Sequence, residues 1–292
     1  MNLRTLLMLG RTSNLPTVWS NMLSGAVLSG ALFGGGSLGL LLVCGSAFYE
    51  GGMFLNDAFD AEIDARERPN RPIPSGQVSQ SSVFALGFGL LALGLVLLLV
   101  APFLRLTQPG FLPALAGAGT CGAVLVYNRW HKGHAWSPIV MGACRAGLYA
   151  TAALSVSGEL SSVVLIGAVS LWLYIVGLTH IARFENGSAI QRTWVAAFVL
   201  SPLLAAAPAV IAQRAPLPAL CFVLLLAWSL RSMSFALRGG KGQIPRAVVS
   251  LIAGASLVDA LFISLHGNSY FVLAALGCFL LTLKWQRKIP GT

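Results

Sequence analysis

Residues 56–76 read NDAFDAEIDARERPNRPIPSG, and this stretch follows directly on an apolar run. The chain has nine Asp and Glu, and six of them fall within residues 50–67. At about 100° per residue, a helix would bring four oxygen-bearing side chains close to one face: those of Asn56, Asp57, Asp60 and Asp64. Oxygen ligands of this kind suit Mg²⁺, which commonly bridges one or two carboxylates and substrate phosphates. We therefore predict that these four residues form a magnesium site; the alternative is a solvated helix end with alternating charges.

The composition predicts a membrane protein. Of the 292 residues 56% are hydrophobic and 10% are charged, and the mean hydropathy is +0.79. We predict an all-α fold, a polytopic transmembrane helical bundle that forms one domain over residues 1–292. Ten apolar stretches are long enough to count, at 17–34, 37–57, 80–104, 111–128, 138–156, 161–180, 193–212, 216–234, 245–265 and 269–285. Because only three residues separate the last two, nine spans plus a re-entrant piece remains an open alternative.

The net charge of +10 does not predict a nucleic-acid partner, because the positions of the charges follow a membrane topology. If the N-terminus is cytoplasmic, the inside segments carry sixteen of the nineteen Lys and Arg. Arg105 and Arg214 are the two on the outside, and Arg145 falls within a span. This asymmetry is the positive-inside rule. We therefore expect an integral protein of the cytoplasmic (inner) membrane, with its N-terminus and the acidic loop inside.

The basic residues next to the acidic stretch have two possible roles. Arg66, Arg68 and Arg71 balance its charge and satisfy the topology rule. Their guanidinium forks also match phosphate oxygens bidentately, so Arg68 and Arg71 are candidates to bind a diphosphate.

Asn21, Arg145 and Asp259 are polar or charged side chains within predicted spans. Asn21 either joins helices or lines a cavity, and the two interpretations are equally open. A buried Arg is costly in a membrane, so Arg145 needs a partner, and the inside carboxylates or a bound anion are the candidates. For Asp259 we favour a structural, hydrogen-bonded role. The five cysteines and four histidines show no paired spacing that would indicate a disulfide framework or a zinc site.

The run N-D-x-x-D-x-x-x-D followed by R-P-x-x-S-G resembles the first signature of the UbiA-type intramembrane prenyltransferases. The opening around Arg11 and Asn14, and the run from Tyr127 through Arg129 to Lys132, are also similar to members of that family. The resemblance implies Mg²⁺-dependent transfer of an isoprenoid chain from its diphosphate to an aromatic or other lipophilic acceptor. It further implies that Lys132 or Arg129 grips the diphosphate and that Tyr127 faces the cavity. The alternative for this segment is a basic-aromatic anchor at the membrane surface.

The chain departs from the family at the second motif. A D-x-x-x-D run is expected near the end of the sixth span, but residues 178–187 read LTHIARFENG, with a single carboxylate at Glu185. Arg183 could supply the positive charge that a second metal ion otherwise brings to the leaving group. We therefore predict catalytic roles for Arg183 and Glu185 beside Asp60 and Asp64. The T-x-I-A-R-x-E run is similar to the EboC-like branch of the superfamily.

The main function hypothesis is a membrane prenyltransferase whose partners are a prenyl diphosphate, a lipophilic acceptor and membrane lipid. The altered second motif keeps one alternative open, which is a protein that binds or carries an isoprenoid without reacting. A lipid-headgroup phosphotransferase also uses intramembrane aspartates, but its D-G-x-x-A-R run is missing from this sequence.

Overall fold

The computed structural model describes residues 3–183, 194–238, 240, 242–266, 269–289 and 291. These residues form α-helices and one short 3-10 helix, with no strand among them, so the predicted all-α bundle is confirmed. The helices are α1 (Leu3–Leu9), η1 (Thr12–Asn14), α2 (Leu15–Leu28), α3 (Gly35–Phe59), α4 (Ala61–Glu67), α5 (Gln80–Val100), α6 (Leu112–Trp130), α7 (Ser137–Val156), α8 (Ser162–Ala182), α9 (Val195–Gln213), α10 (Pro216–Arg238), α11 (Gln243–Ser264) and α12 (Ser269–Gln286).

Each of the ten predicted apolar stretches corresponds to one helix, but eight of these helices are long and apolar enough to cross a membrane. The two that fall short within the described ranges are α2, which has 14 residues, and α6, which is rich in glycine and alanine. The stretch predicted at 17–34 is too long, because α2 ends at Leu28 and Gly30 adopts a φ of 74°. A glycine with positive φ ends a helix without steric cost.

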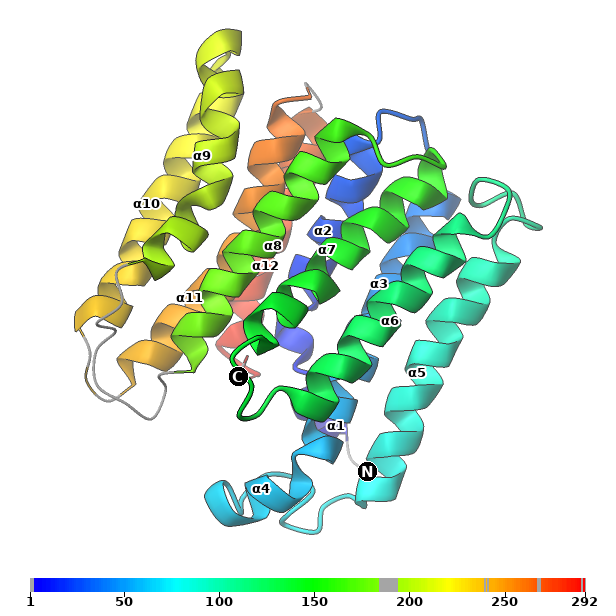
Figure 1. The fold of residues 1–292 in the computed structure, drawn as a ribbon, viewed down its shortest axis with the longest axis vertical. Coiled ribbons are helices and arrows are strands. Elements are labelled where there is room, and N and C mark those ends of the chain that lie inside the picture. Colours follow the sequence, from blue (N-terminus) through cyan, green and yellow to red (C-terminus); the bar gives the residue numbers. More distant parts are fainter. Residues whose placement is uncertain are drawn as a thin grey trace.

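The bundle is organised around α2 and α11, which are its most deeply buried long helices (Figure 1). Both pack against α12 and α8, and α2 also contacts α7 and α3. The α9–α10 pair packs on α8 and α11 at one edge of the bundle, whereas α5 packs on α3 and α6 at the other (Figure 1). The α3–α5 contact is close because Gly51 and Gly87 face each other, and a Cβ on Gly51 would lie 2.9 Å from the Gly87 carbonyl oxygen. Small residues at such contacts let helices approach in a membrane.

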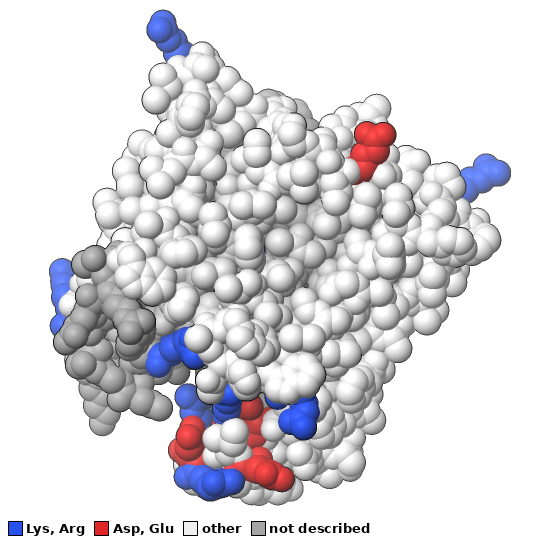
Figure 2. All heavy atoms as spheres, viewed as in Figure 1, with Lys and Arg blue, Asp and Glu red and all other residues white. Residues whose placement is uncertain are grey.

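Charged side chains concentrate at one end of the bundle. Figure 2 shows Lys, Arg, Asp and Glu gathered where α4 lies, whereas the sides on the drawn face are almost free of charge. This distribution agrees with a bundle whose sides face lipid.

The acidic stretch does not form the single continuous helix that we predicted. α3 ends at Phe59 and α4 begins at Ala61, with Asp60 between them at φ −85° and ψ −2°. Backbone hydrogen bonds from Asp60 to Asn56 and from Asp64 to Asp60 hold this junction together. The bend re-aims the side chains after Asp60, so their arrangement depends on the junction and not on helical spacing alone. α4 ends at Glu67, two residues before Pro69, as expected from the proline.

Candidate active site

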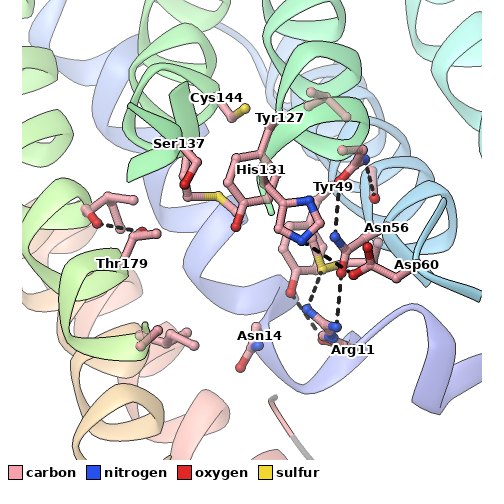
Figure 3. Close-up of a pocket in the computed structure, with 18 of the residues that line it drawn as sticks. Arg11, Asn14, Tyr49, Asn56, Asp60, Tyr127, His131, Ser137, Cys144 and Thr179 are labelled. Atoms are coloured by element: carbon pink, nitrogen blue, oxygen red, sulfur yellow. Dashed lines mark hydrogen bonds and ion pairs between the residues drawn. The ribbon is translucent and has the colours of Figure 1, made fainter. Parts of the chain in front are cut away.

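A cavity of about 530 Å³ opens at the charged end of the bundle. Its mouth carries charged side chains, and its deeper wall is apolar. Figure 3 shows Tyr49, Asn56, Asp60 and His131 gathered on one wall near Arg11. The residues that line it include Arg11, Tyr49, Asn56, Asp60, Asp64, Arg68, Arg71, Tyr127, His131, Lys132, Met141, Cys144, Arg145, Leu148, Ile175, Leu178, Thr179, Arg183, Val248 and Ile252.

Arg71 links two carboxylates of the acidic stretch. Its Nη1 lies 3.0 Å from Asp57 Oδ1 and 2.9 Å from Asp64 Oδ2. The turn between α4 and Arg71, closed by a backbone hydrogen bond from Arg71 N to the Arg68 carbonyl, brings Arg71 back to α4, so a residue seven positions after Asp64 can contact it. The predicted proximity of Arg71 to the acidic face is therefore present, and in this structure the arginine neutralises the carboxylates directly.

Asp57 differs from the other members of the predicted metal set. It is not among the residues that line the cavity, and its Oδ1 also accepts from Arg11 Nη2 at 3.3 Å. Two arginines thus occupy the carboxylate oxygen that was predicted to bind a metal. Burial disfavours the charged form of Arg11, but the Asp57 carboxylate, together with Tyr49, Tyr127 and Asp60, outweighs this effect and holds the pKa of Arg11 above its ordinary value.

Asp60 pairs with the segment that follows α6. His131 Nε2 and Lys132 Nζ each lie 3.3 Å from Asp60 Oδ2. Burial pushes the pKa of the Asp60 carboxyl upward, but the hydrogen bond and charge from His131 and the charge of Lys132 outweigh it. The pKa of Asp60 therefore lies below its ordinary value. His131 also stacks on Tyr127, with ring centroids 4.9 Å apart.

Asn56 connects α3 to α6. Its Nδ2 donates to Asn128 Oδ1 at 3.3 Å, and Asn128 donates to the Gly52 carbonyl at 2.9 Å. Asn56 Oδ1 accepts from Arg11 Nη2 at 3.2 Å. These bonds fix the amide so that its nitrogen faces Asn128 and its oxygen faces Arg11.

Some of the residues predicted to bind a diphosphate line the cavity, and one does not. Lys132 and Tyr127 line the cavity, as does Arg68. Arg129 is exposed and is not among the lining residues, so the structure favours Lys132 over Arg129.

Arg183 lines the cavity from the end of α8. Its Nη2 donates to the His134 carbonyl at 3.0 Å and its Nη1 to the Ala135 carbonyl at 3.3 Å, so it also holds the α6–α7 loop. Glu185, the other residue predicted in this region, lies outside the described residues.

The polar residues within the spans form a separate, buried network. Arg145 Nη1 donates to Thr17 Oγ1 at 3.1 Å and to Asn21 Oδ1 at 2.8 Å. Asn21 Nδ2 donates to Asp259 Oδ2 at 2.8 Å, and the Tyr149 hydroxyl donates to Asp259 Oδ1. The structural role that we favoured for Asp259 agrees with these contacts. Asn21 is fully buried and is not a lining residue, so any role in substrate binding acts through Arg145.

The sequence profile of the UbiA prenyltransferase family matches residues 13–241 of this chain. The chain belongs to the UbiA prenyltransferase family. The match includes the acidic stretch, the α6–α7 segment and the described end of α8, but not Arg11, which lies just before it.

Individual relatives agree with this assignment. A digeranylgeranylglyceryl phosphate synthase of Metallosphaera sedula is 31% identical over 145 residues, which are 50% of this chain and 39% of that protein. The matched stretch thus spans less than half of the relative's length. A UbiA homologue of Aeropyrum pernix superposes with a TM-score of 0.67 at 18% identity, over 85% of this chain and 97% of that one. A UbiA homologue of Archaeoglobus fulgidus, bound to DMAPP and Mg²⁺, superposes with a TM-score of 0.53 at 14% identity, over 94% and 99% of the two chains.

The donor chemistry of this UbiA-family chain fits a magnesium ion that shares its ligands with a substrate. Within the described residues, no group of three or more His, Cys, Asp and Glu side chains is arranged to hold a metal. Mg²⁺ does not need such a cage, because it usually keeps several waters and takes one or two carboxylates plus substrate phosphates. Asp60 and Asp64 line the cavity and would provide the carboxylates, and Asn56 would provide an amide oxygen.

Two residues of the site were missed from the sequence. Arg11 was noted for its family resemblance and was given no role, yet it contacts both Asn56 and Asp57. His131 lies inside the segment from Tyr127 to Lys132 and contacts Asp60. A signal was available for His131, because it lies one helical turn after Tyr127 and so on the same face of α6.

Proposed function

We propose that this protein transfers an isoprenoid chain from its diphosphate to a lipophilic acceptor within the membrane. The observation that carries the proposal is a single cavity with a charged mouth and an apolar depth. A prenyl diphosphate has the same division, because a multiply charged head is attached to a hydrocarbon tail. The UbiA homologue of Archaeoglobus fulgidus with DMAPP and Mg²⁺ supports this assignment by analogy of fold.

The diphosphate head is assigned to the mouth. Arg68, Arg71 and Lys132 bind its oxygens, and Arg183 adds positive charge from α8. For this to happen, Arg71 and Lys132 exchange their carboxylate partners for phosphate oxygens. Asp60, Asp64 and Asn56 would then be free to hold Mg²⁺, and a bound Mg²⁺ would supply positive charge to stabilise the departing diphosphate.

The reaction is a substitution at the first carbon of the isoprenoid. The bond from this carbon to the diphosphate oxygen breaks, and its electron pair leaves with the diphosphate. The nucleophilic atom of the acceptor forms the new bond to that carbon and loses its proton to the site or to water. Apolar residues such as Leu148, Ile175 and Leu178 surround the tail and exclude water from the cationic carbon.

The acceptor is the less defined substrate. The relative from Metallosphaera sedula is named for a product that is a glyceryl phosphate with isoprenoid chains. This supports testing a glyceryl phosphate ether first, ahead of the aromatic acceptors that the sequence resemblance also allows.

Turnover distinguishes the enzyme from a carrier. Purified protein is incubated with Mg²⁺, prenyl diphosphates of several lengths, and both acceptor classes, and pyrophosphate and prenylated product are measured. We expect equal amounts of the two products. Binding of the diphosphate without release of pyrophosphate in any mixture would support the carrier hypothesis instead.

The orientation is a further part of this proposal. The excess of Lys and Arg at the end that carries the acidic stretch supports a cytoplasmic position for that end, in the inner membrane. A cysteine introduced by Ser75→Cys, in the exposed turn after Arg71, should resist labelling by an impermeant reagent in intact cells. Efficient labelling before lysis would reverse the orientation.

A further inference from the structure

Two exposed arginines of the bundle have no part in the site at the cavity mouth. Arg231 lies within α10 and Arg246 lies in the first turn of α11, and neither of them lines the cavity. The end of α10 and the beginning of α11 lie toward the same end of the bundle as α4 (Figure 1). Since α10 is long and apolar enough to cross a membrane, a cation within it needs a partner.

Arg231 is held over an aromatic platform. Its guanidinium carbon lies 4.9 Å from the centroid of the Trp228 ring and 5.4 Å from that of Phe235. Trp228 is itself fixed, because its Nε1 donates to the Ser250 carbonyl at 2.8 Å and its ring packs edge-on against Phe279, with centroids 4.8 Å apart. These cation–π contacts stabilise the positive charge but provide no oxygen acceptor for the N–H groups of the guanidinium.

Arg246 contacts the same platform from the neighbouring helix. Its guanidinium carbon lies 4.3 Å from the centroid of Phe235, so both cations contact one ring. Among the described residues, neither arginine side chain donates a hydrogen bond to an oxygen or pairs with a carboxylate, whereas Arg71 at the mouth has two carboxylate partners. Two like charges that share a ring repel each other. A bound anion removes this repulsion and accepts their N–H groups.

We infer that Arg231 and Arg246 bind the headgroup phosphate of an anionic phospholipid, on the exposed side of the α10–α11 contact. Arg231 lies seven residues before the end of α10 at Arg238, about 10 Å into the helix. A soluble anion would have to leave water to reach this level, whereas the phosphate of a lipid is already held at the membrane surface and arginine extends toward it. Positive charge without a carboxylate partner favours a lipid with a net negative charge over a zwitterionic one.

The side chains of α10 that precede Arg231 match the rest of such a lipid. Leu224, Trp228 and Arg231 follow one another at spacings of four and three residues, which places them on one face of the helix. Leu224 is 39% exposed and Trp228 is half-buried. This face therefore runs from an apolar part within the membrane to a cation nearer its surface, in the order in which a phospholipid presents its acyl chains and its phosphate.

The first test compares the thermal unfolding of detergent-purified protein with phosphatidylglycerol and with phosphatidylcholine of the same acyl chains. Phosphatidylglycerol should raise the unfolding temperature of wild-type protein by about 2–4 °C more than phosphatidylcholine does. This difference should disappear in the double variant Arg231→Gln/Arg246→Gln. Inorganic phosphate is the soluble anion of the same chemistry, and it should give no comparable shift.

The matched control removes the same number of charges elsewhere. Arg105 and Arg214 are exposed and follow α5 and α9, at the opposite end of the bundle (Figure 1). The double variant Arg105→Gln/Arg214→Gln should therefore keep the wild-type difference between the two lipids.

The second test locates the lipid and does not depend on the double variant, which could fail to fold. Lipids with brominated acyl chains quench the fluorescence of a tryptophan that they contact. Brominated phosphatidylglycerol should quench wild-type protein more than brominated phosphatidylcholine does. Trp228→Phe keeps an aromatic ring beside Arg231 and should lose most of this excess, and Arg246→Gln alone should reduce it. Trp130→Phe, which replaces an exposed tryptophan at the end of α6, should keep the excess.

Several results would overturn the inference. It is wrong if the two lipids stabilise wild-type protein equally, or if Arg231→Gln/Arg246→Gln keeps the wild-type difference. An equal loss in Arg105→Gln/Arg214→Gln would show that net charge attracts the lipid without regard to position. A shift with inorganic phosphate as large as that with phosphatidylglycerol would identify a soluble anion as the ligand. None of these measurements involves prenyl transfer, so their outcome is independent of the proposed function.

Discussion

Basic and acidic side chains lie near one another both at the mouth of the cavity and in the deeper network around Arg145. They contact each other directly at the mouth and indirectly at depth. At the mouth the contacts are direct, such as Arg71 to Asp64 at 2.9 Å and Lys132 to Asp60 at 3.3 Å. At depth, the neutral Asn21 amide separates Arg145 from Asp259. The carboxylates of the mouth are buried, but their basic partners Arg71 and Lys132 are partly exposed, so water screens these pairs and lowers the cost of exchanging partners. In an apolar interior a charge needs fixed hydrogen bonds. Under the proposed function the mouth would bind and release a diphosphate, whereas the charged groups at depth are held by fixed hydrogen bonds.

The largest effect is expected at the mouth. Asp64→Ala removes a carboxylate that is 3% exposed and leaves Arg71 without one of its two partners. Loss of the leaving-group stabilisation should lower turnover roughly thirtyfold to several-hundredfold, which corresponds to about 2–4 kcal/mol. Pyrophosphate release at saturating prenyl diphosphate measures the effect. Glu62→Ala on the exposed side of α4 is the control, and an equal loss there would mean that charge near the mouth matters without regard to position.

Arg183→Ala should have the next largest effect. The side chain lines the cavity and fixes the loop that carries Lys132 through the carbonyls of His134 and Ala135. We expect a loss of about tenfold to a hundredfold that added Mg²⁺ does not rescue, because the missing group is an arginine and not a metal. Arg183→Lys should recover part of the activity. Wild-type turnover of Arg183→Ala together with an inactive Glu185→Ala would instead indicate a second metal site.

The sequence was sufficient to predict the helical bundle and the segments that meet at the mouth of the cavity. Apolar stretches predicted every long helix because lipid requires them, and alternating crossings bring the acidic stretch, the segment at Lys132 and Arg183 to one end. These inferences depend on composition and chain direction, which the sequence states directly.

The pairing of charges could not be predicted in the same way. Arg11 reaches Asp57 across 46 positions, and this contact depends on how η1 is placed against α3. The break at Asp60 contains no glycine or proline, so the sequence does not predict it. Helical spacing predicted Asp57 as a metal ligand, but it does not show that Asp57 pairs with two arginines. Long-range side-chain contacts of this kind are set by packing.

A smaller effect is expected at depth, where the network depends on a close contact between α2 and α7. A Cβ on Gly25 would lie 2.5 Å from the Tyr149 carbonyl oxygen, and backbone cannot move aside as a flexible side chain can. Gly25→Ala should therefore destabilise the protein by about 1–3 kcal/mol, as other overpacking substitutions do. Thermal unfolding in detergent measures it. Gly89→Ala in α5 meets no atom within 4 Å and should be neutral or slightly stabilising, so equal losses in both variants would argue against a close α2–α7 contact.

The smallest effect concerns the protonation of Asp60 at the mouth. The folded protein holds the pKa of Asp60 below the ordinary value of 3.8, so its charge stabilises the fold above that value. This contribution is lost as the pH falls through the lowered pKa, because the unfolded chain takes up the proton first. Acidification from about pH 7 to below about pH 4 should therefore lower the unfolding temperature of wild-type protein more than that of Asp60→Asn. A difference of about 2 °C is expected, because Asp60 is buried but its partner Lys132 is exposed enough for water to screen the ion pair. If the unfolding temperatures of the two proteins fall equally with pH, His131 and Lys132 do not pair with Asp60 in solution. The direct ion pairing that distinguishes the mouth from the depth would then be absent at Asp60.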